Sequence, residues 1–354
     1  MALALASTAM ALVFAEAAAR QIYPFFQSWT RPAGSSSRDE CGPTVQFDEN
    51  VGWWPKPHLD CLEPAERSVR FRTNSLGLRS DREFGPKPDG VLRIAVLGDS
   101  FTFGALVTRE ETYAALLEQA VPMVETVNFG LGGGGPDQSL LALRHKGRAL
   151  DIDALIVAPS VENIERVMMT ERDGRPKPYF TRAANGLELH NHPVPWTPPS
   201  QGRPAGPVGT GGPILRQSAL WQLLLAGMRP VTLRAGVYRP YAAEYRGPAG
   251  AVLEQILAGF RRESGDAPIL FAPLPTYHYI EYDIPQDYAP VFKRAADAAN
   301  GIYVDILPAF KQLPTEERRA MRFRFDQHYT PAAHRVVADA LRPHVMTLTR
   351  TEGP

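Results

Sequence analysis

The residues of this 354-residue chain that could perform covalent catalysis lie at two distant places in the sequence. Ser100 follows the apolar run 91–98, while Asp326 and His328 lie two residues apart near the other end. A serine hydroxyl is a weak nucleophile at neutral pH, so it needs a base that takes its proton during attack. An imidazole titrates near neutrality, and a neighbouring carboxylate can hold its tautomer. The three side chains therefore predict acyl transfer, with Ser100 as nucleophile, His328 as base and Asp326 as its partner.

The elements that must position these side chains alternate between strands and helices. Apolar runs predict five strands, at residues 92–97, 124–128, 154–158, 268–272 and 302–305. Helical patterns predict five helices, at residues 110–120, 137–149, 249–263, 287–299 and 332–348. Such alternation is typical of an α/β fold whose parallel sheet is covered on both faces. Ser100 would then lie on a tight turn at the carboxyl edge of the sheet, where open α/β folds place their chemistry.

Sequence blocks along residues 91–345 resemble those of the SGNH (GDSL-type) hydrolases. The matching blocks are Gly98-Asp99-Ser100 followed by Phe101, the glycine-rich segment 127–138, and Asp326-x-His328 followed by Pro331 and His334. The resemblance implies a flavodoxin-like, three-layer α/β/α fold with a parallel sheet, preceded by a small β-rich region. It also implies a serine esterase that forms an acyl-enzyme and uses neither an organic cofactor nor a metal.

The oxyanion hole expected from this resemblance has one irregular member. Acyl transfer needs hydrogen-bond donors where negative charge develops, and the backbone N–H of Ser100 is one candidate. The resemblance assigns a second donor to Gly133, although a plain flexible loop is the alternative. The third block departs from the family pattern, because Glu162 stands where an asparagine is expected and Asn163 follows it. A carboxylate cannot donate a hydrogen bond, so we expect Asn163 to act through a one-residue shift; otherwise the oxyanion hole is weakened.

Alternatives exist for the acid and the base. Many members of the family place the acid three residues before the histidine, but that position is Phe325 here, so the role passes to Asp326. Asp326 could instead cap the final helix. We expect Asp99 to shape the turn before the nucleophile rather than act on the base. His334 is the second candidate base, although it lies one turn inside a predicted helix.

The chain divides into segments of different composition. Residues 1–20 are mostly apolar and are expected to form a membrane anchor or export signal, with a buried alanine-rich helix as the alternative. Residues 21–37 read as a linker, 38–90 as a small β-rich region, and 91–350 as the hydrolase domain. The insertion 171–215 holds nine Pro and seven Gly, a composition that predicts a loop or partly disordered flap.

Composition narrows the partners and the compartment. Lys+Arg and Asp+Glu both number 38, which argues against a nucleic-acid binder because such proteins usually carry a basic surplus. Cys41 and Cys61 are the only cysteines, and either a disulfide or two free thiols is compatible with the sequence. No Cys-x-x-Cys pair accompanies them, so a zinc site is not expected. The segment 73–79 resembles one in envelope-associated members, so a periplasmic or membrane-anchored location is expected.

The favoured activity is hydrolysis of O-acyl esters, O-acetyl esters in particular, on a carbohydrate or envelope polysaccharide. Three alternatives remain open at this point. An O-acetyltransferase would use the same three residues with a sugar hydroxyl as acceptor. A lipase or lysophospholipase would use the apolar stretch 216–234 as an acyl-chain groove. A catalytically inactive glycan-binding module would explain the altered third block.

Overall fold

The computed structural model describes residues 11, 14–21, 41–63, 65–184, 186–196, 228, 231–235 and 237–351. Residues 14–21 are helical. Most of the predicted anchor 1–20, nearly all of the linker 21–37 and most of the apolar stretch 216–234 lie outside the described residues. Within the described part of the chain, no helix combines the length and the apolar character needed to cross a membrane.

A five-stranded parallel sheet forms the centre of the molecule. Its strands stand in the order β13-β12-β7-β5-β6, and every pairing is parallel. They are β5 (Leu92–Gly98), β6 (Val124–Gly130), β7 (Ala154–Val157), β12 (Ile269–Phe271) and β13 (Ile302–Tyr303). All residues of β5 and β7 are buried, as expected for central strands covered on both faces. The five predicted strands are therefore confirmed, within a few residues at their ends.

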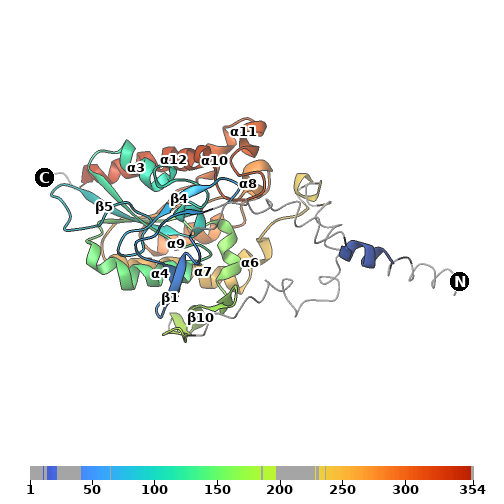
Figure 1. Cartoon of the computed structure of the whole chain (residues 1–354), viewed down its shortest axis with the longest axis horizontal. Coiled ribbons are helices and arrows are strands. Elements are labelled where there is room, and N and C mark those ends of the chain that lie inside the picture. The colour runs from blue at the N-terminus through green and yellow to red at the C-terminus, as the bar shows by residue number, and fades with distance from the viewer. Residues whose placement is uncertain are drawn as a thin grey trace.

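Helices cover both faces of this sheet, which confirms the predicted three-layer α/β/α fold (Figure 1). The helices α3 (Tyr113–Ala120) and α12 (Pro331–Thr351) pack against each other on one face. The helices α4 (Pro136–Ala142) and α9 (Ala289–Ala298) pack against α7 (Pro248–Ser264) on the other. Shorter helical segments are α2 (Ser100–Phe103), η1 (Arg109–Glu111), η2 (Leu143–Gly147), η3 (Arg148–Leu150), η4 (Val161–Arg166), α6 (Ala242–Arg246), α8 (Tyr277–Glu281), α10 (Leu307–Lys311) and α11 (Thr315–Arg319).

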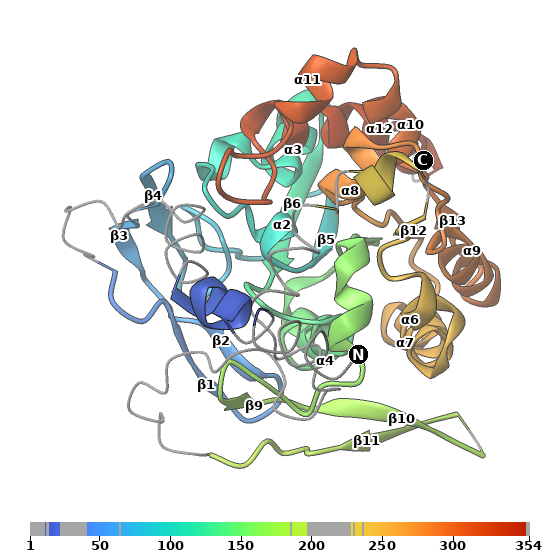
Figure 2. The same cartoon turned by 90° about the vertical axis from the view of Figure 1, so that its right-hand side faces the viewer.

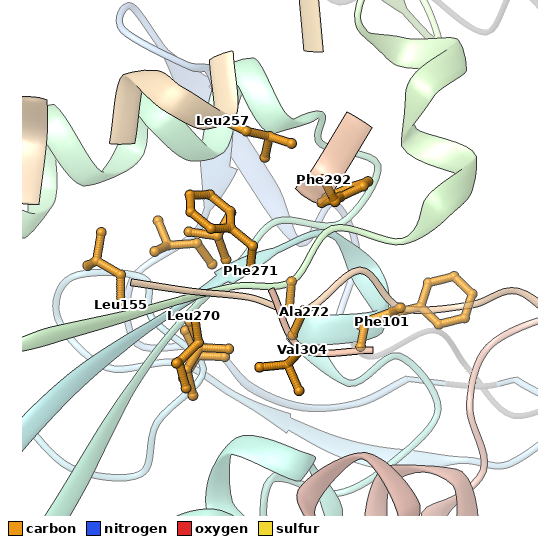
Figure 3. Close-up of a cluster of buried hydrophobic side chains, with 14 of the residues drawn as sticks. Phe101, Leu155, Leu257, Leu270, Phe271, Ala272, Phe292 and Val304 are labelled. Carbon is orange, nitrogen blue, oxygen red and sulfur yellow. The ribbon is translucent and has the colours of Figure 1, made fainter. Parts of the chain in front are cut away.

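The hydrophobic core fills the space between the sheet and its two helical layers. Side chains of successive strand residues point to opposite faces, so Phe271 of β12 lies toward Leu257 and Phe292 while Leu270 points the other way (Figure 3). All four side chains are at most 1% exposed. This packing fixes the carboxyl ends of the strands, from which the candidate site is built.

Residues 41–90 form the predicted small β-rich region. It contains two antiparallel hairpins, β1 (Val45–Asp48) with β2 (Gly52–Pro55) and β3 (Asp60–Glu63) with β4 (Val69–Arg72). A disulfide joins Cys41 to Cys61, with their Cα atoms 5.1 Å apart. Of the two states that the sequence left open, the structure therefore shows the bonded one.

The first part of the insertion is more regular than its composition predicts. Residues 171–190 form two antiparallel hairpins, β8 (Glu171–Arg172) with β9 (Arg175–Pro176) and β10 (Tyr179–Ala183) with β11 (Gly186–His190). The prediction of a loop is therefore wrong for these residues, and 197–215 lie outside the described residues. Gly174 lies in the turn between β8 and β9, and Gly186 begins β11; both have positive φ, and Phe180 is buried. Figure 2 shows β9 beside the N-terminal hairpin, and β9 contacts β2.

Candidate active site

Ser100 begins α2, and Asp99 alone separates it from the end of β5. β5 lies between β6 and β7, and the chain leaves β6 to return on the other side of β5. The connecting helices α3 and α4 lie on opposite faces of the sheet (Figure 1). The serine therefore lies at the switch point of an open parallel sheet, where such folds bind their ligands. The Asp99 side chain caps the turn by accepting the N–H of Phe101 at 3.0 Å, as the predicted turn-shaping role requires.

The structure brings the three residues predicted for acyl transfer together. His328 Nε2 lies 2.7 Å from Ser100 Oγ, and His328 Nδ1 lies 2.5 Å from Asp326 Oδ1. The same carboxylate oxygen accepts the backbone N–H of His328 at 2.8 Å, which ties the acid to the base across their two-residue spacing. The His328 ring packs against Phe101 with ring centroids 4.9 Å apart. These contacts form one continuous chain from hydroxyl to carboxylate.

The electrostatics of the His328–Asp326 pair favour the charged forms of both groups. Burial opposes protonation of His328, but the hydrogen bond and charge of Asp326 outweigh it, helped by Asp99 and Glu162, so its pKa is raised. Burial likewise opposes ionisation of Asp326, but the hydrogen bond and charge of His328 outweigh it and lower that pKa. The geometry therefore supports an imidazole that accepts a proton while the carboxylate stays ionised.

The glycine loop after β6 lies at the same edge and presents Gly133. Its φ of +71° lies in the left-handed region, and Gly132 and Gly133 are partly exposed. Gly134 donates its N–H to Leu131 O at 2.8 Å, which closes the turn. Within the described part of the chain, no other residue accepts the N–H of Ser100 or Gly133. Both N–H groups therefore have no protein acceptor among the described residues, and their role in the oxyanion hole stays a prediction.

Asn163 and Glu162 take different positions in η4. Asn163 is 1% exposed, and its Nδ2 donates to Asp99 Oδ2 at 2.9 Å. An amide nitrogen carries two hydrogens, and among the described residues Asp99 is the one acceptor recorded for them. Glu162 instead accepts Arg166 Nη2 at 2.6 Å and the amide Nε2 of Gln327 at 2.8 Å. The expected donor role of Asn163 therefore stays a prediction. Glu162 binds Arg166 and Gln327 and does not bind the Asn163 amide.

A buried network around Asp99 was not foreseen from the sequence. Asp99 is 1% exposed, and its Oδ2 accepts Ser160 Oγ at 2.7 Å and Arg166 Nη1 at 3.3 Å in addition to Asn163. Arg166 Nη1 also donates to the carbonyl of Gly134 at 2.8 Å. Arg166 thus joins the nucleophile turn, the third block and the glycine loop. The one signal for it was the four-residue spacing from Glu162, which on a helical turn favours an ion pair.

His334, the second candidate base, is part of the core. It is 1% exposed, its Nδ1 accepts the N–H of Tyr113 at 3.2 Å, and burial lowers its pKa to about 3. A histidine held neutral by burial and bonded to the backbone of α3 stabilises the packing of α12 on α3. Across the described residues, no cluster of three or more His, Cys, Asp or Glu side chains could hold a metal ion.

Comparison with known proteins shows that this chain is similar to several solved structures. No protein-family model and no curated protein matches this chain. It is similar to a lipase/acylhydrolase from Enterococcus faecalis, with 13% identity over 73% of this chain and 96% of that one and a TM-score of 0.40. A catalytic mutant of an acetylxylan esterase from Geobacillus stearothermophilus shares 18% identity over 72% and 95%, with a TM-score of 0.39. A member of the lipolytic G-D-S-L family from Veillonella parvula shares 10% identity over 73% and 99%, with a TM-score of 0.33. The fold assignment rests on this chain's own sheet order, and the chemistry rests on the contacts of Ser100.

Proposed function

We propose that this chain is a serine esterase of the SGNH (GDSL) type that removes O-acyl groups, O-acetyl groups in particular, from a carbohydrate. The observation that carries the proposal is the continuous hydrogen-bonded chain from Ser100 through His328 to Asp326. It lies beside the partly exposed glycine loop, at the carboxyl edge of a parallel sheet. A nucleophile, its base and an orienting acid in this order are the parts that acyl transfer requires.

The first half of the reaction forms an acyl-enzyme. Ser100 Oγ attacks the ester carbonyl carbon while its proton passes to His328 Nε2, and Asp326 stabilises the imidazolium. The carbonyl oxygen becomes an oxyanion that the N–H groups of Ser100 and Gly133 and the amide of Asn163 can hold. The carbon–oxygen bond of the alcohol then breaks, His328 returns its proton to the leaving oxygen, and the alcohol departs.

The second half regenerates the enzyme with water. His328 takes a proton from a water molecule, whose oxygen attacks the carbonyl carbon of acyl-Ser100. The same donors hold the second oxyanion. The bond to Ser100 Oγ breaks, the serine recovers its proton from His328, and the carboxylic acid leaves. A sugar hydroxyl in place of that water would turn the hydrolase into an acetyltransferase.

The carbohydrate substrate and the envelope location are parts of the proposal that rest on the motif resemblance. The Cys41–Cys61 disulfide supports a location outside the cytosol, because structural disulfides persist in oxidising compartments. An acetylated oligosaccharide incubated with the enzyme should release free acetate. Transfer of the acetyl group to an added oligosaccharide, with no acetate released, would favour the transferase instead.

The esterase proposal is tested with p-nitrophenyl acetate and the full chain. Turnover should be lost in Ser100→Ala and retained in Ser68→Ala, whose serine is exposed and lies in the turn before β4. A fluorophosphonate probe should label the wild type and the Ser68→Ala variant but not Ser100→Ala. Absence of both turnover and labelling in the folded wild type would contradict the proposal and favour a binding module.

A further inference from the structure

One cation beside the glycine loop has no role in the reaction described above. Arg172, at the end of β8, lies against Gly133: a Cβ added to that glycine would be 3.4 Å from Arg172 Nε and 3.8 Å from Cδ. Within the described residues, the buried Nε of Arg172 has no hydrogen-bond partner. The Cα–H side of Gly133, rather than its N–H, faces this arginine. Arg172 therefore flanks the glycine loop without replacing the backbone N–H of Gly133 as a donor.

The hairpin that carries Arg172 is anchored to the rest of the fold. Lys177, directly after β9, is fully buried and forms an ion pair with the equally buried Asp137 of α4. Its Nζ also donates to the carbonyls of Met169 at 3.2 Å and Pro178 at 3.0 Å. These contacts hold both ends of the β8–β9 hairpin. A side chain on this hairpin is therefore placed by the fold rather than by a free loop.

A second contact joins the same hairpin to the glycine loop. The guanidinium of Arg175 lies 4.9 Å from the centre of the Trp53 ring. The indole Nε1 of Trp53 donates to the carbonyl of Gly132 at 3.0 Å. The buried Trp53 therefore contacts both the β8–β9 hairpin and the glycine loop, and these contacts fix the position of Arg172 relative to Gly133.

The charge of Arg172 is only partly compensated, because the carboxylates of Glu162 and Asp99 act on it from beyond ion-pair distance. Its ion-pair partner is Asp173, at 3.6 Å, and that carboxylate is 62% exposed, so the pair contributes little. The Arg172 side chain itself is 29% exposed. Burial and the positive charge of Arg166 lower the pKa of the Arg172 guanidinium. The group stays protonated because the ordinary pKa of arginine lies far above neutrality. A partly buried cation whose Nε has no hydrogen-bond partner would be stabilised by an anion that entered the site with the substrate.

We propose that Arg172 binds an anionic group, a carboxylate or a phosphate, on the same molecule as the ester that Ser100 attacks. The inference rests on the proposed esterase function and narrows its substrate class to acidic esters. Arginine suits this task because its planar fork of N–H donors matches the oxygens of both groups. Arg172 is thus a specificity-determining residue, and it acts on substrate binding rather than on the chemical step.

The experiment compares matched neutral and anionic esters on the full chain. The anion is placed on the alcohol side with p-acetoxybenzoate against p-acetoxybenzamide, and on the acyl side with mono-p-nitrophenyl succinate against p-nitrophenyl butyrate. A further arm, p-acetoxyphenyl phosphate, separates a preference for phosphate from one for carboxylate. The variants are Arg172→Met, Arg172→Lys and the control Arg182→Met, which removes an exposed arginine from β10 of the same insertion.

In Arg172→Met, kcat/KM for at least one anionic ester should fall about 10- to 100-fold, mainly through KM. Turnover of its neutral partner should change less than about threefold. Arg172→Lys should recover part of the loss. Arg182→Met should leave unchanged the ratio of kcat/KM for each anionic ester to that for its neutral partner. Added salt should lower turnover of the anionic ester by wild type more than in Arg172→Met.

Two results would overturn the inference while leaving the esterase function intact. One is that Arg172→Met leaves the ratio of kcat/KM for the anionic and neutral esters unchanged with every substrate tested. The other is an equal fall for neutral and anionic esters, which would make Arg172 a residue that supports the transition state or the loop. Turnover of the neutral esters also reports that each variant is folded. Failure of wild type to hydrolyse even the neutral esters would instead contradict the proposed function.

Discussion

Replacing Arg166 with leucine should destabilise the fold strongly, because this guanidinium separates two buried carboxylates. Its side chain is 6% exposed and contacts Glu162 at 2.6 Å, Gly134 O at 2.8 Å and Asp99 at 3.3 Å. The Asp99 side chain is 1% exposed and that of Glu162 is 10% exposed. Leucine fills part of the space but leaves both carboxylates without their cation.

The cost follows from what remains after the change. Removing one partner of a buried ion pair typically costs about 3–5 kcal/mol, because the other charge stays buried and unpaired. Asp99 keeps its bonds from Ser160 and Asn163, whereas among the described residues Glu162 keeps only the amide of Gln327. We therefore expect a loss of about 3 kcal/mol in the free energy of unfolding, the lower end of that range.

The same change should make stability depend on pH in a defined direction. Burial raises the pKa of the Glu162 carboxyl even though Arg166 opposes it, so the folded state holds this proton more tightly than the unfolded state. A group of this kind destabilises the fold as pH rises through its folded-state pKa. Without Arg166 that pKa rises further. The penalty of Arg166→Leu should therefore be smaller near pH 5 and larger near pH 8.

Urea unfolding at these two pH values measures the effect, with Arg294→Leu as the matched control. Arg294 forms an ion pair with Glu254 at 2.8 Å, but their side chains are 56% and 30% exposed. An exposed pair of this kind is worth less than about 1 kcal/mol. Equal losses in the two variants, or a loss in Arg166→Leu that shrinks as pH rises, would refute the reasoning.

Three further predictions concern the triad, the oxyanion hole and the disulfide. The acid limb of the pH–kcat/KM profile should lie above pH 6.5, because the pKa of His328 is raised, and Asp326→Asn should move it to lower pH. Asn163→Ala should lower kcat for p-nitrophenyl acetate about 10²- to 10³-fold at nearly constant KM; a change below about threefold would remove Asn163 from the oxyanion hole. Replacing Cys41 and Cys61 together with alanine should cost about 3 kcal/mol in urea unfolding with little change in kcat, and an unchanged midpoint would contradict it.

The parts of the fold that could be predicted are those encoded over short distances. Strand β5 is an apolar run with Arg93 as its single charged residue, and Thr330-Pro331 marks the start of α12, so both follow from local sequence. Ser100 and His328 were found because each stands in a motif at the end of a predictable element. Their approach to 2.7 Å then follows from the parallel sheet, which brings distant loops to one edge.

The parts that could not be predicted depend on tertiary contacts. Lys177 is a charged residue in a Pro- and Gly-rich segment, and nothing local indicates that it is fully buried against Asp137. That ion pair gives the short β8–β9 hairpin an anchor that its composition does not suggest, which is why the loop prediction was wrong there. The proximity of Arg172 to Gly133 is a consequence of the same anchor.

The four consecutive glycines at 132–135 raise the question of how a flexible sequence can hold Gly133, the proposed oxyanion donor, in place. The structure holds each side of Gly133 through a different partner. Trp53 Nε1 binds the carbonyl of Gly132, and Arg166 binds that of Gly134 at 2.8 Å. Gln138 accepts the N–H of Gly135 at 3.0 Å and itself donates to a carbonyl of the N-terminal region at 2.6 Å. In the proposed reaction the glycines would let the backbone approach the substrate closely, and residues from the N-terminal region and η4 supply the rigidity that the glycines lack.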